Sequence, residues 1–121
     1  MRVAVILGLL ALAVLAAGCG GSRQSIDVGY GADAARAPDE IDAYGCAGCH
    51  TIAGIASSAQ VGPELKDFAK RRYIAGRLPN TPANLVEWIR DPQRVDPGNV
   101  MPDLGVTRGD ARDIAAYLYR H

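Results

Sequence analysis

The sequence predicts an all-α fold of about four helices for residues 38–121, and two observations support this prediction. Apolar side chains recur at helical spacing in several segments that begin with a proline or a threonine suited to a helix start. No segment alternates convincingly between apolar and polar residues, as a half-buried strand would. Without the first 18 residues, 121 − 18 = 103 residues remain, which suits one domain with a limited core.

The first 18 residues carry the features of an export signal. Fifteen of them are apolar, and Arg2 precedes a stretch from Val3 to Leu15 that has no charged residue. Small residues follow, as they do at a signal cleavage site. The stretch is shorter than the roughly 20 apolar residues of a transmembrane helix, so a permanent span is the weaker alternative. We therefore expect residues 1–18 to be a signal peptide.

The signal ends in Leu15-Ala16-Ala17-Gly18-Cys19, which resembles the lipobox of bacterial lipoproteins. In that class the cysteine is acylated, and several acyl chains hold the protein durably at a membrane. The alternative is that Cys19 is only a small residue near an ordinary cleavage site. Residues 19–37 are rich in Gly, Ser, Ala and Asp without apolar periodicity. We expect them to form a lipid-anchored flexible tether on the periplasmic face of a bacterial membrane.

The first predicted helix leads into the strongest motif of the chain. It would begin at Pro38, which suits a first helical position, and run into Cys46-Ala47-Gly48-Cys49-His50. This C-x-x-C-H pattern is typical of covalent haem c attachment. On one helical turn the two cysteines face the same side, where both can form thioethers, and His50 can reach the iron. A thioredoxin-like disulfide site would need a β-rich setting and a zinc site two further ligands, and the sequence offers neither.

Two residues are candidates for the second axial ligand of this haem. After the leader, Met101 is the single methionine and His121 the single histidine besides His50. Met101 precedes a proline in the segment 96–102, which suits a loop over the far haem face, and its thioether would raise the reduction potential. His121 is the last residue and is prone to fraying. We therefore predict His50 and Met101 as the iron ligands of one haem c.

Three further helices are predicted after the motif. Residues 63–72 would form a short one, opened by a proline. Residues 82–91 would form the next, capped by Thr81 and ended by a proline, and Thr107 with Asp110 resembles the capping box of a last helix. The inward-facing side chains of these segments would be Leu65, Phe68 and Ala69; Leu85, Trp88 and Ile89; and Ile114, Ala115 and Leu118.

Taken together, these features resemble class I cytochrome c. They are the export signal, the early C-x-x-C-H, the pair Gly62-Pro63, a tryptophan helix, a late Met-Pro and a C-terminal amphipathic helix. The resemblance spans residues 38–119 and implies that the carbonyl of Pro63 orients His50. It also implies that the first and last helices cross, with Tyr44 and Tyr117 at their contact.

The same resemblance implies partners for a haem propionate, namely Trp88, Tyr73 and Asn80. Ordinary core packing is the alternative for Trp88. Segments 73–82 and 88–92 also look like the cytochrome c domains fused to oxidase subunit II. The implied partners are therefore redox proteins, such as cytochrome c oxidase or a quinol-cytochrome c reductase.

The resulting interpretation is a membrane-tethered carrier of single electrons in a respiratory chain. No nucleophile-base pair, carboxylate dyad or phosphate loop can be made out, so the sequence gives no support for an enzyme. The alternatives are a haem-based gas sensor and a small peroxidase, both of which need a labile sixth ligand.

Charge excludes one class of partner and suggests how another could dock. Without the leader the chain has 12 basic and 13 acidic residues, so no nucleic-acid partner is indicated. A basic stretch follows the cysteine pair, and it either steers docking onto an acidic partner or is a solvated helix end. Its members are Lys66, Lys70, Arg71, Arg72 and Arg77, and the acidic residues that precede the cysteines are Asp27, Asp33, Asp39, Glu40 and Asp42.

Overall fold

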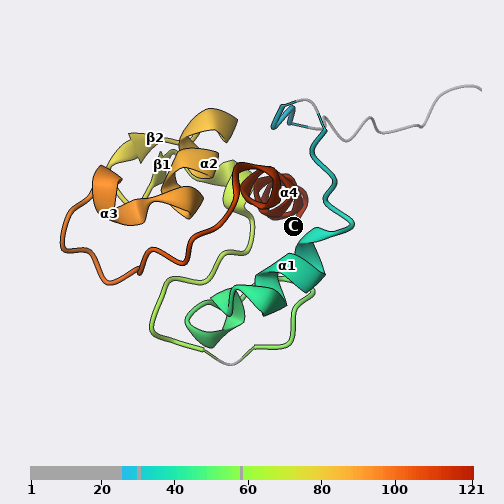
Figure 1. Ribbon diagram of the computed structural model, residues 1–121, viewed down its shortest axis with the longest axis horizontal. Coiled ribbons are helices and arrows are strands. Elements are labelled where there is room, and N and C mark those ends of the chain that lie inside the picture. Colours follow the sequence, from blue (N-terminus) through green and yellow to red (C-terminus); the bar gives the residue numbers. More distant parts are fainter. Residues whose placement is uncertain (1–25, 30, 58) are drawn as a thin grey trace, which may run out of the picture.

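The computed structural model describes residues 26–29, 31–57 and 59–121 (Figure 1). The predicted signal peptide and Cys19 lie outside these residues. The helices are α1 (Ala37–Ala43), α2 (Pro82–Arg90), α3 (Pro92–Val95) and α4 (Arg108–Arg120). Two 3-10 turns, η1 (Cys46–Gly48) and η2 (Phe68–Lys70), and one antiparallel pair of two-residue strands, β1 (Tyr73–Ile74) and β2 (Leu78–Pro79), complete the elements. The fold is all-α as predicted, apart from this short hairpin.

Helix α4 is the centre of the fold, and α1, α2 and η2 pack around it (Figure 1). It begins with the predicted cap, since the Thr107 hydroxyl accepts a hydrogen bond from the backbone N–H of Asp110 at 3.2 Å. Its predicted apolar stripe, Ile114, Ala115 and Leu118, is buried. Most of this helix is buried, because the other elements pack against it. In the described part of the chain, none of the helices has the length and apolar character needed to cross a bilayer.

Helix α2 also begins and ends as predicted. The Thr81 hydroxyl accepts from the backbone N–H of Asn84 at 3.2 Å, and the helix ends at Arg90, before Pro92. The sequence analysis did not predict that Pro92 then starts the four-residue helix α3. Asp91 lies between the two helices and caps α3, since its carboxylate accepts a hydrogen bond from the backbone N–H of Arg94 at 3.0 Å.

The helix predicted over residues 63–72 is wrong, because only η2 forms there. Two hydrogen bonds hold the start of the segment in an extended path: the Pro63 carbonyl accepts from the His50 ring, and the Leu65 N–H donates to the Thr51 carbonyl at 2.8 Å. Asp67 has a φ of 52°, in the left-handed region that interrupts a helix. Phe68 is nevertheless buried as predicted, whereas Ala69 is exposed.

The packed domain begins before residue 38, inside the predicted tether. Ala34 and Ala37 are buried, and Val28 packs against the core. The side chain of Asp113 on α4, which has 0 % exposure, accepts a hydrogen bond from the backbone N–H of Asp33 at 2.6 Å and forms an ion pair with Arg36. The segment just before α1 is therefore fastened to α4, although it lacks the apolar periodicity that would have predicted packing.

The crossing of α1 and α4 contains one of the two predicted tyrosines. The hydroxyl of Tyr44, at the end of α1, donates to the Asp110 carboxylate on α4 at 2.7 Å. The Tyr117 hydroxyl instead donates to the carbonyl of Ala53 at 2.8 Å, so it fastens the loop after η1 to α4.

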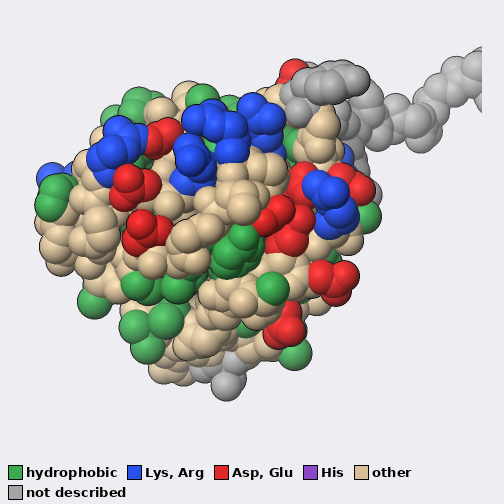
Figure 2. All heavy atoms as spheres, in the orientation of Figure 1, with side chains coloured by type: hydrophobic (Ala, Val, Ile, Leu, Met, Phe, Trp, Pro, Cys, Tyr) green, Lys and Arg blue, Asp and Glu red, His purple; other side chains and the backbone are tan. Residues whose placement is uncertain are grey.

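Figure 2 shows acidic side chains gathered over α1, whereas basic side chains lie along the edge that carries α2.

Candidate functional site

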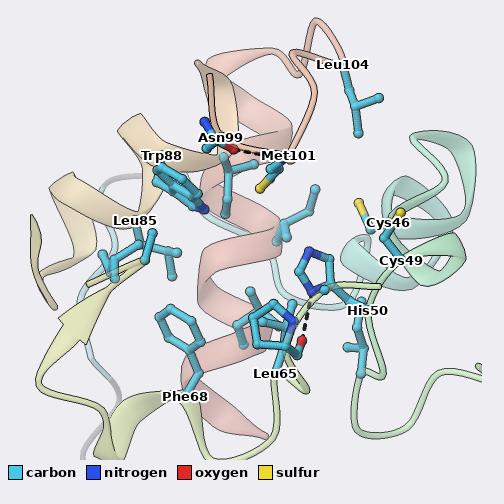
Figure 3. Close-up of a pocket in the computed structure, with 18 of the residues that line it drawn as sticks. Cys46, Cys49, His50, Leu65, Phe68, Leu85, Trp88, Asn99, Met101 and Leu104 are labelled. Carbon is cyan, nitrogen blue, oxygen red and sulfur yellow. Dashed lines mark hydrogen bonds between the residues drawn. The ribbon is translucent and has the colours of Figure 1, made fainter. Parts of the chain in front are cut away.

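The four residues of the predicted haem site line one cavity. It has a volume of about 420 Å³ and lies between α1, α2, α4 and the two loops that follow η1 and α3 (Figure 3). Cys46, Cys49, His50 and Met101 all belong to its lining. The rest of the wall is mainly apolar and includes Ile41, Leu85, Ile89, Ile114 and Leu118. A large apolar cofactor fits such a cavity because the lining is apolar. Its burial would also enlarge the hydrophobic core, which is small in a chain of this length.

The attachment turn is built by the end of α1. Gly45 has a φ of 72°, a left-handed conformation that glycine adopts without strain and that turns the chain into η1. The backbone N–H groups of Cys49 and His50 donate to the Cys46 carbonyl at 3.2 and 3.0 Å. The hydroxyl of Ser57 is 2.8 Å from the carbonyls of both Ala47 and His50 and braces the turn from the following loop.

Burial raises the pKa of the Cys46 thiol, so this group stays protonated at neutral pH. Cysteines of dithiol oxidoreductases have a lowered pKa, because the thiolate is their nucleophile. Cys46 and Cys49 are free thiols in the structure. Within the described ranges, no group of three or more His, Cys, Asp and Glu side chains is placed to hold a metal ion such as zinc.

The imidazole of His50 is held in one orientation. Its Nδ1 lies 2.8 Å from the carbonyl oxygen of Pro63, the acceptor predicted from the family resemblance. Because a carbonyl can only accept, Nδ1 carries the proton and Nε2 keeps the lone pair that an iron ligand needs. Gly62 packs directly against the ring. Figure 3 shows the ring extending into the cavity beside the two cysteine sulfurs.

Met101 enters the cavity from the loop that follows α3. Figure 3 shows its sulfur directed inward from the side across from His50. The other candidate, His121, is not part of the cavity lining. Its ring stacks on Tyr117 with centroids 4.1 Å apart, and its Nδ1 donates to the Tyr117 carbonyl at 3.0 Å. The structure therefore brings Met101, and not His121, to the site.

The three predicted propionate partners differ in where they lie. Trp88 and Tyr73 line the cavity, and Asn80 is not among its lining residues. The propionate roles of all three stay predictions. The amide of Asn80 donates to the carbonyls of Phe68 and Arg71, both at 2.9 Å, and its oxygen accepts from the Tyr119 hydroxyl at 2.7 Å. The side chain is fully engaged in joining η2, the hairpin and α4.

The sequence analysis missed three polar residues of the cavity lining, which are Arg71, Asp96 and Asn99. Arg71 lines the cavity, and its guanidinium lies over the Phe68 ring, 5.2 Å from the centroid. Among the described residues no other Lys or Arg belongs to the lining, so Arg71 is its one source of positive charge. Asn99 lines the cavity next to Met101. Its position between a glycine and the methionine was visible in the sequence, but nothing there indicated where its amide points.

Comparison with known proteins gives one family match and several relatives. The family model for cytochrome c matches residues 35–120. Cytochrome c oxidase subunit 2 of Alkalihalophilus pseudofirmus is 43% identical over 74 residues, which are 60% of this chain and 21% of the relative. The same subunit of Bacillus sp. strain PS3 is 41% identical over 59 residues, or 46% of this chain and 17% of the relative. That of Bacillus subtilis is 30% identical over 77 residues, or 61% and 22%. The chain thus spans about a fifth of the length of the curated relatives it matches.

Proposed function

The chain belongs to the cytochrome c family, and on this premise we propose that it is a carrier of single electrons with one low-spin haem c. One observation carries the proposal. An imidazole and a thioether reach the same apolar cavity from two sides, and two thiols stand beside the imidazole at the spacing for covalent attachment.

Each side chain has a definite role in this proposal. The sulfurs of Cys46 and Cys49 would hold the haem covalently, and Nε2 of His50 and Sδ of Met101 would ligate its iron. The bound haem supplies a reversible one-electron exchange between ferric and ferrous iron. With His50 and Met101 as iron ligands and apolar side chains around the site, the protein would limit rearrangement between the two redox states. Trp88, Tyr73 and Arg71 would offer donors and positive charge to the propionates.

We further propose a respiratory context. Three relatives are named as subunit 2 of cytochrome c oxidase. The residues that the cytochrome c family model matches, 35–120, hold the C-x-x-C-H motif and Met101. A terminal oxidase is therefore the proposed electron acceptor, and a quinol-cytochrome c reductase is the proposed electron donor. In this role the chain passes electrons on and does not itself make or break substrate bonds.

Tethering to a membrane is proposed from the sequence. The signal peptide and the lipobox-like ending at Cys19 predict a domain held by lipid on the periplasmic face. Substitution Cys19→Ala in the full chain tests this prediction by fractionation. The wild type should sediment with membranes and Cys19→Ala should be released into the soluble fraction. Equal release of both would exclude the anchor.

The optical spectra of the matured holoprotein and of Met101→Ala test the electron-carrier proposal. The ferric wild type should show the weak near-infrared band of a sulfur-to-iron bond, and the ferrous wild type should not bind carbon monoxide. Met101→Ala should lose the band and bind carbon monoxide. If the wild type itself binds carbon monoxide readily or turns over peroxide, the sixth site is labile and a gas sensor or small peroxidase replaces the carrier.

A further inference from the structure

We infer that Gln93 and Asn99 are positioning residues whose side-chain amides hold the Met101 loop closed. This inference rests on the proposed role of Met101 as the sixth ligand. Gln93 lies in α3 and Asn99 lies in the loop of residues 96–102, and both side chains are half-buried. Neither residue was predicted as a site residue from the sequence, although Asn99 lines the cavity.

The amide of Gln93 ties three points of the loop together. Its Nε2 donates to the carbonyl of Asn99 at 2.9 Å and to the carbonyl of Met101 at 2.8 Å. Its Oε1 accepts from the backbone N–H of Gly98 at 3.1 Å. Both hydrogens and the oxygen of one side chain are therefore used to fold the loop back onto α3.

The amide of Asn99 closes the same loop from within. Its Nδ2 donates to the carbonyl of Pro92 at 2.9 Å and to that of Asp96 at 2.7 Å. Its Oδ1 accepts from the backbone N–H of Met101 at 2.7 Å. The N–H and the C=O of Met101 are thus each held by a side-chain amide (Figure 3 shows the bond from Asn99).

Besides these two amides, the loop is supported by a main-chain hydrogen bond from the N–H of Asn99 to the carbonyl of Asp96 at 3.2 Å and by the ion pair of Asp96 with Arg77 at 2.9 Å. Across the described residues, the recorded hydrogen bonds to the main chain of Met101 come from these two amides alone. Val100, the residue before the ligand, is 90% exposed. Gly98 has a φ of 83°, so the loop also turns through a left-handed residue. A loop with few buried apolar contacts opens locally at low cost, so these amides decide how long the sulfur stays in the cavity.

An amide is required in both positions because the acceptors are carbonyl oxygens. A glutamate at position 93 has the shape of glutamine, but its carboxylate can donate to neither carbonyl and would repel both. Gln93→Glu therefore removes the restraint with almost no change of volume. Gln60, which is exposed and does not line the cavity, offers a control in which Gln60→Glu makes the same chemical change outside the Met101 loop.

The test compares the holoproteins of the wild type, Gln93→Glu and Gln60→Glu at neutral pH. The measurements are the sulfur-to-iron band of the ferric form and the rate of carbon monoxide binding to the ferrous form. Gln93→Glu should weaken the band and bind carbon monoxide roughly tenfold faster or more, because two donated hydrogen bonds are lost. Gln60→Glu should match the wild type. Far-ultraviolet circular dichroism should stay unchanged in all three, which separates loop opening from unfolding.

The outcomes separate this inference from the proposed function. If the wild type shows the band and excludes carbon monoxide, but Gln93→Glu does the same, the positioning role is refuted and the carrier stands. If the wild type lacks the band, both are refuted. Should Gln93→Glu fail to mature with haem, Asn99→Asp decides the question in the same assay, because it keeps the acceptor for the Met101 N–H and loses the donors to Pro92 and Asp96. An unchanged Asn99→Asp would then overturn the inference.

Discussion

Gly62 lies so close to the imidazole of His50 that a β-carbon on Gly62 would come within 2.6 Å of Nδ1. The same Nδ1 donates to the carbonyl of Pro63, the next residue, at 2.8 Å. The chain therefore passes along the ring edge, with the glycine leaving room for the ring and the proline carbonyl fixing its tautomer. This contact sets the direction in which Nε2 faces the cavity.

Gly62→Ala should therefore displace the His50 ring. The added methyl group would lie 2.4 Å from Cε1 and 2.6 Å from Nδ1 of the ring, and overpacking of this kind costs about 1–3 kcal/mol. We expect a lower yield of attached haem and an altered ferric spectrum, measured as haem per polypeptide and by optical absorption. Gly109→Ala in α4 is the matched control, since a β-carbon there meets only the Thr107 hydroxyl at 3.8 Å. Equal yields and spectra for both variants would contradict the proposed packing.

Asn80→Ala tests whether this residue has a propionate role or a structural one. Its three hydrogen bonds join η2, the hairpin and Tyr119 on α4, so their loss should reduce the free energy of unfolding by about 1–3 kcal/mol. The reduction potential of the holoprotein should stay near that of the wild type, because Asn80 lies outside the cavity lining. Trp88→Phe provides the contrast, since Trp88 lines the cavity. If the shift in reduction potential is as large for Asn80→Ala as for Trp88→Phe, Asn80 does have a propionate role.

Local signals in the sequence predicted the elements that local chemistry determines. Thr81 and Thr107 cap helices because a hydroxyl satisfies a free N–H of the first turn, whatever the rest of the chain does. The C-x-x-C-H motif likewise has a chemical meaning of its own. The helix prediction for residues 63–72 failed because the path of this segment is set by partners elsewhere in the chain, the His50 ring and the Thr51 carbonyl. The hydrogen bonds of Gln93 and Asn99 could not be predicted for the same reason, because a sequence does not reveal the partners of a side-chain amide.

Glu40 gives the fold a specific pH dependence. Burial first, and then the charge of Asp113 and its hydrogen bond, raise the pKa of Glu40 from 4.5 to about 7. Asp110 on α4 raises the pKa of Glu40 further, and Arg36 on the preceding segment lowers it. The Oε2 atom of Glu40 is buried and has no hydrogen-bond partner in the described part of the chain. Because the folded state holds this proton more tightly than the unfolded state, its contribution to stability is full below pH 4.5 and is lost as the pH rises to about 7.

Glu40→Gln should remove that dependence. We expect the free energy of unfolding of the wild type to fall by about 1–3 kcal/mol between roughly pH 5 and 8, and that of Glu40→Gln to fall less, so that the variant is the more stable form at pH 8. Urea denaturation of the holoprotein across this range is the measurement. Glu64→Gln, at an exposed position, is the control and should follow the wild type. Parallel curves for the wild type and Glu40→Gln would show that Glu40 does not titrate in this window.

The basic stretch after the cysteines is less free than the sequence suggested. Lys70 pairs with Asp67 at 2.8 Å, Arg77 pairs with Asp96 at 2.9 Å, and Arg71 donates to the Glu64 carbonyl beside the cavity. Lys66 and Arg72 are exposed, and no ion pair is recorded for either in the described part of the chain. Any steering of an acidic partner should therefore depend on these two residues.

Charge reversal at both positions, Lys66→Glu with Arg72→Glu, should slow electron transfer to the oxidase several-fold at low ionic strength. The effect should fade as salt is added, because the Debye length falls to about 8 Å at physiological ionic strength. Stopped-flow oxidation of the reduced holoprotein by purified cytochrome c oxidase measures this rate. The control is Arg108→Glu with Arg120→Glu, at the two exposed ends of α4, which makes the same change of charge outside the stretch and should have a smaller effect. If the first double variant and the control slow transfer equally, overall charge and not this stretch governs docking. If neither changes the rate, the exposed bases are only the solvated surface of a loop.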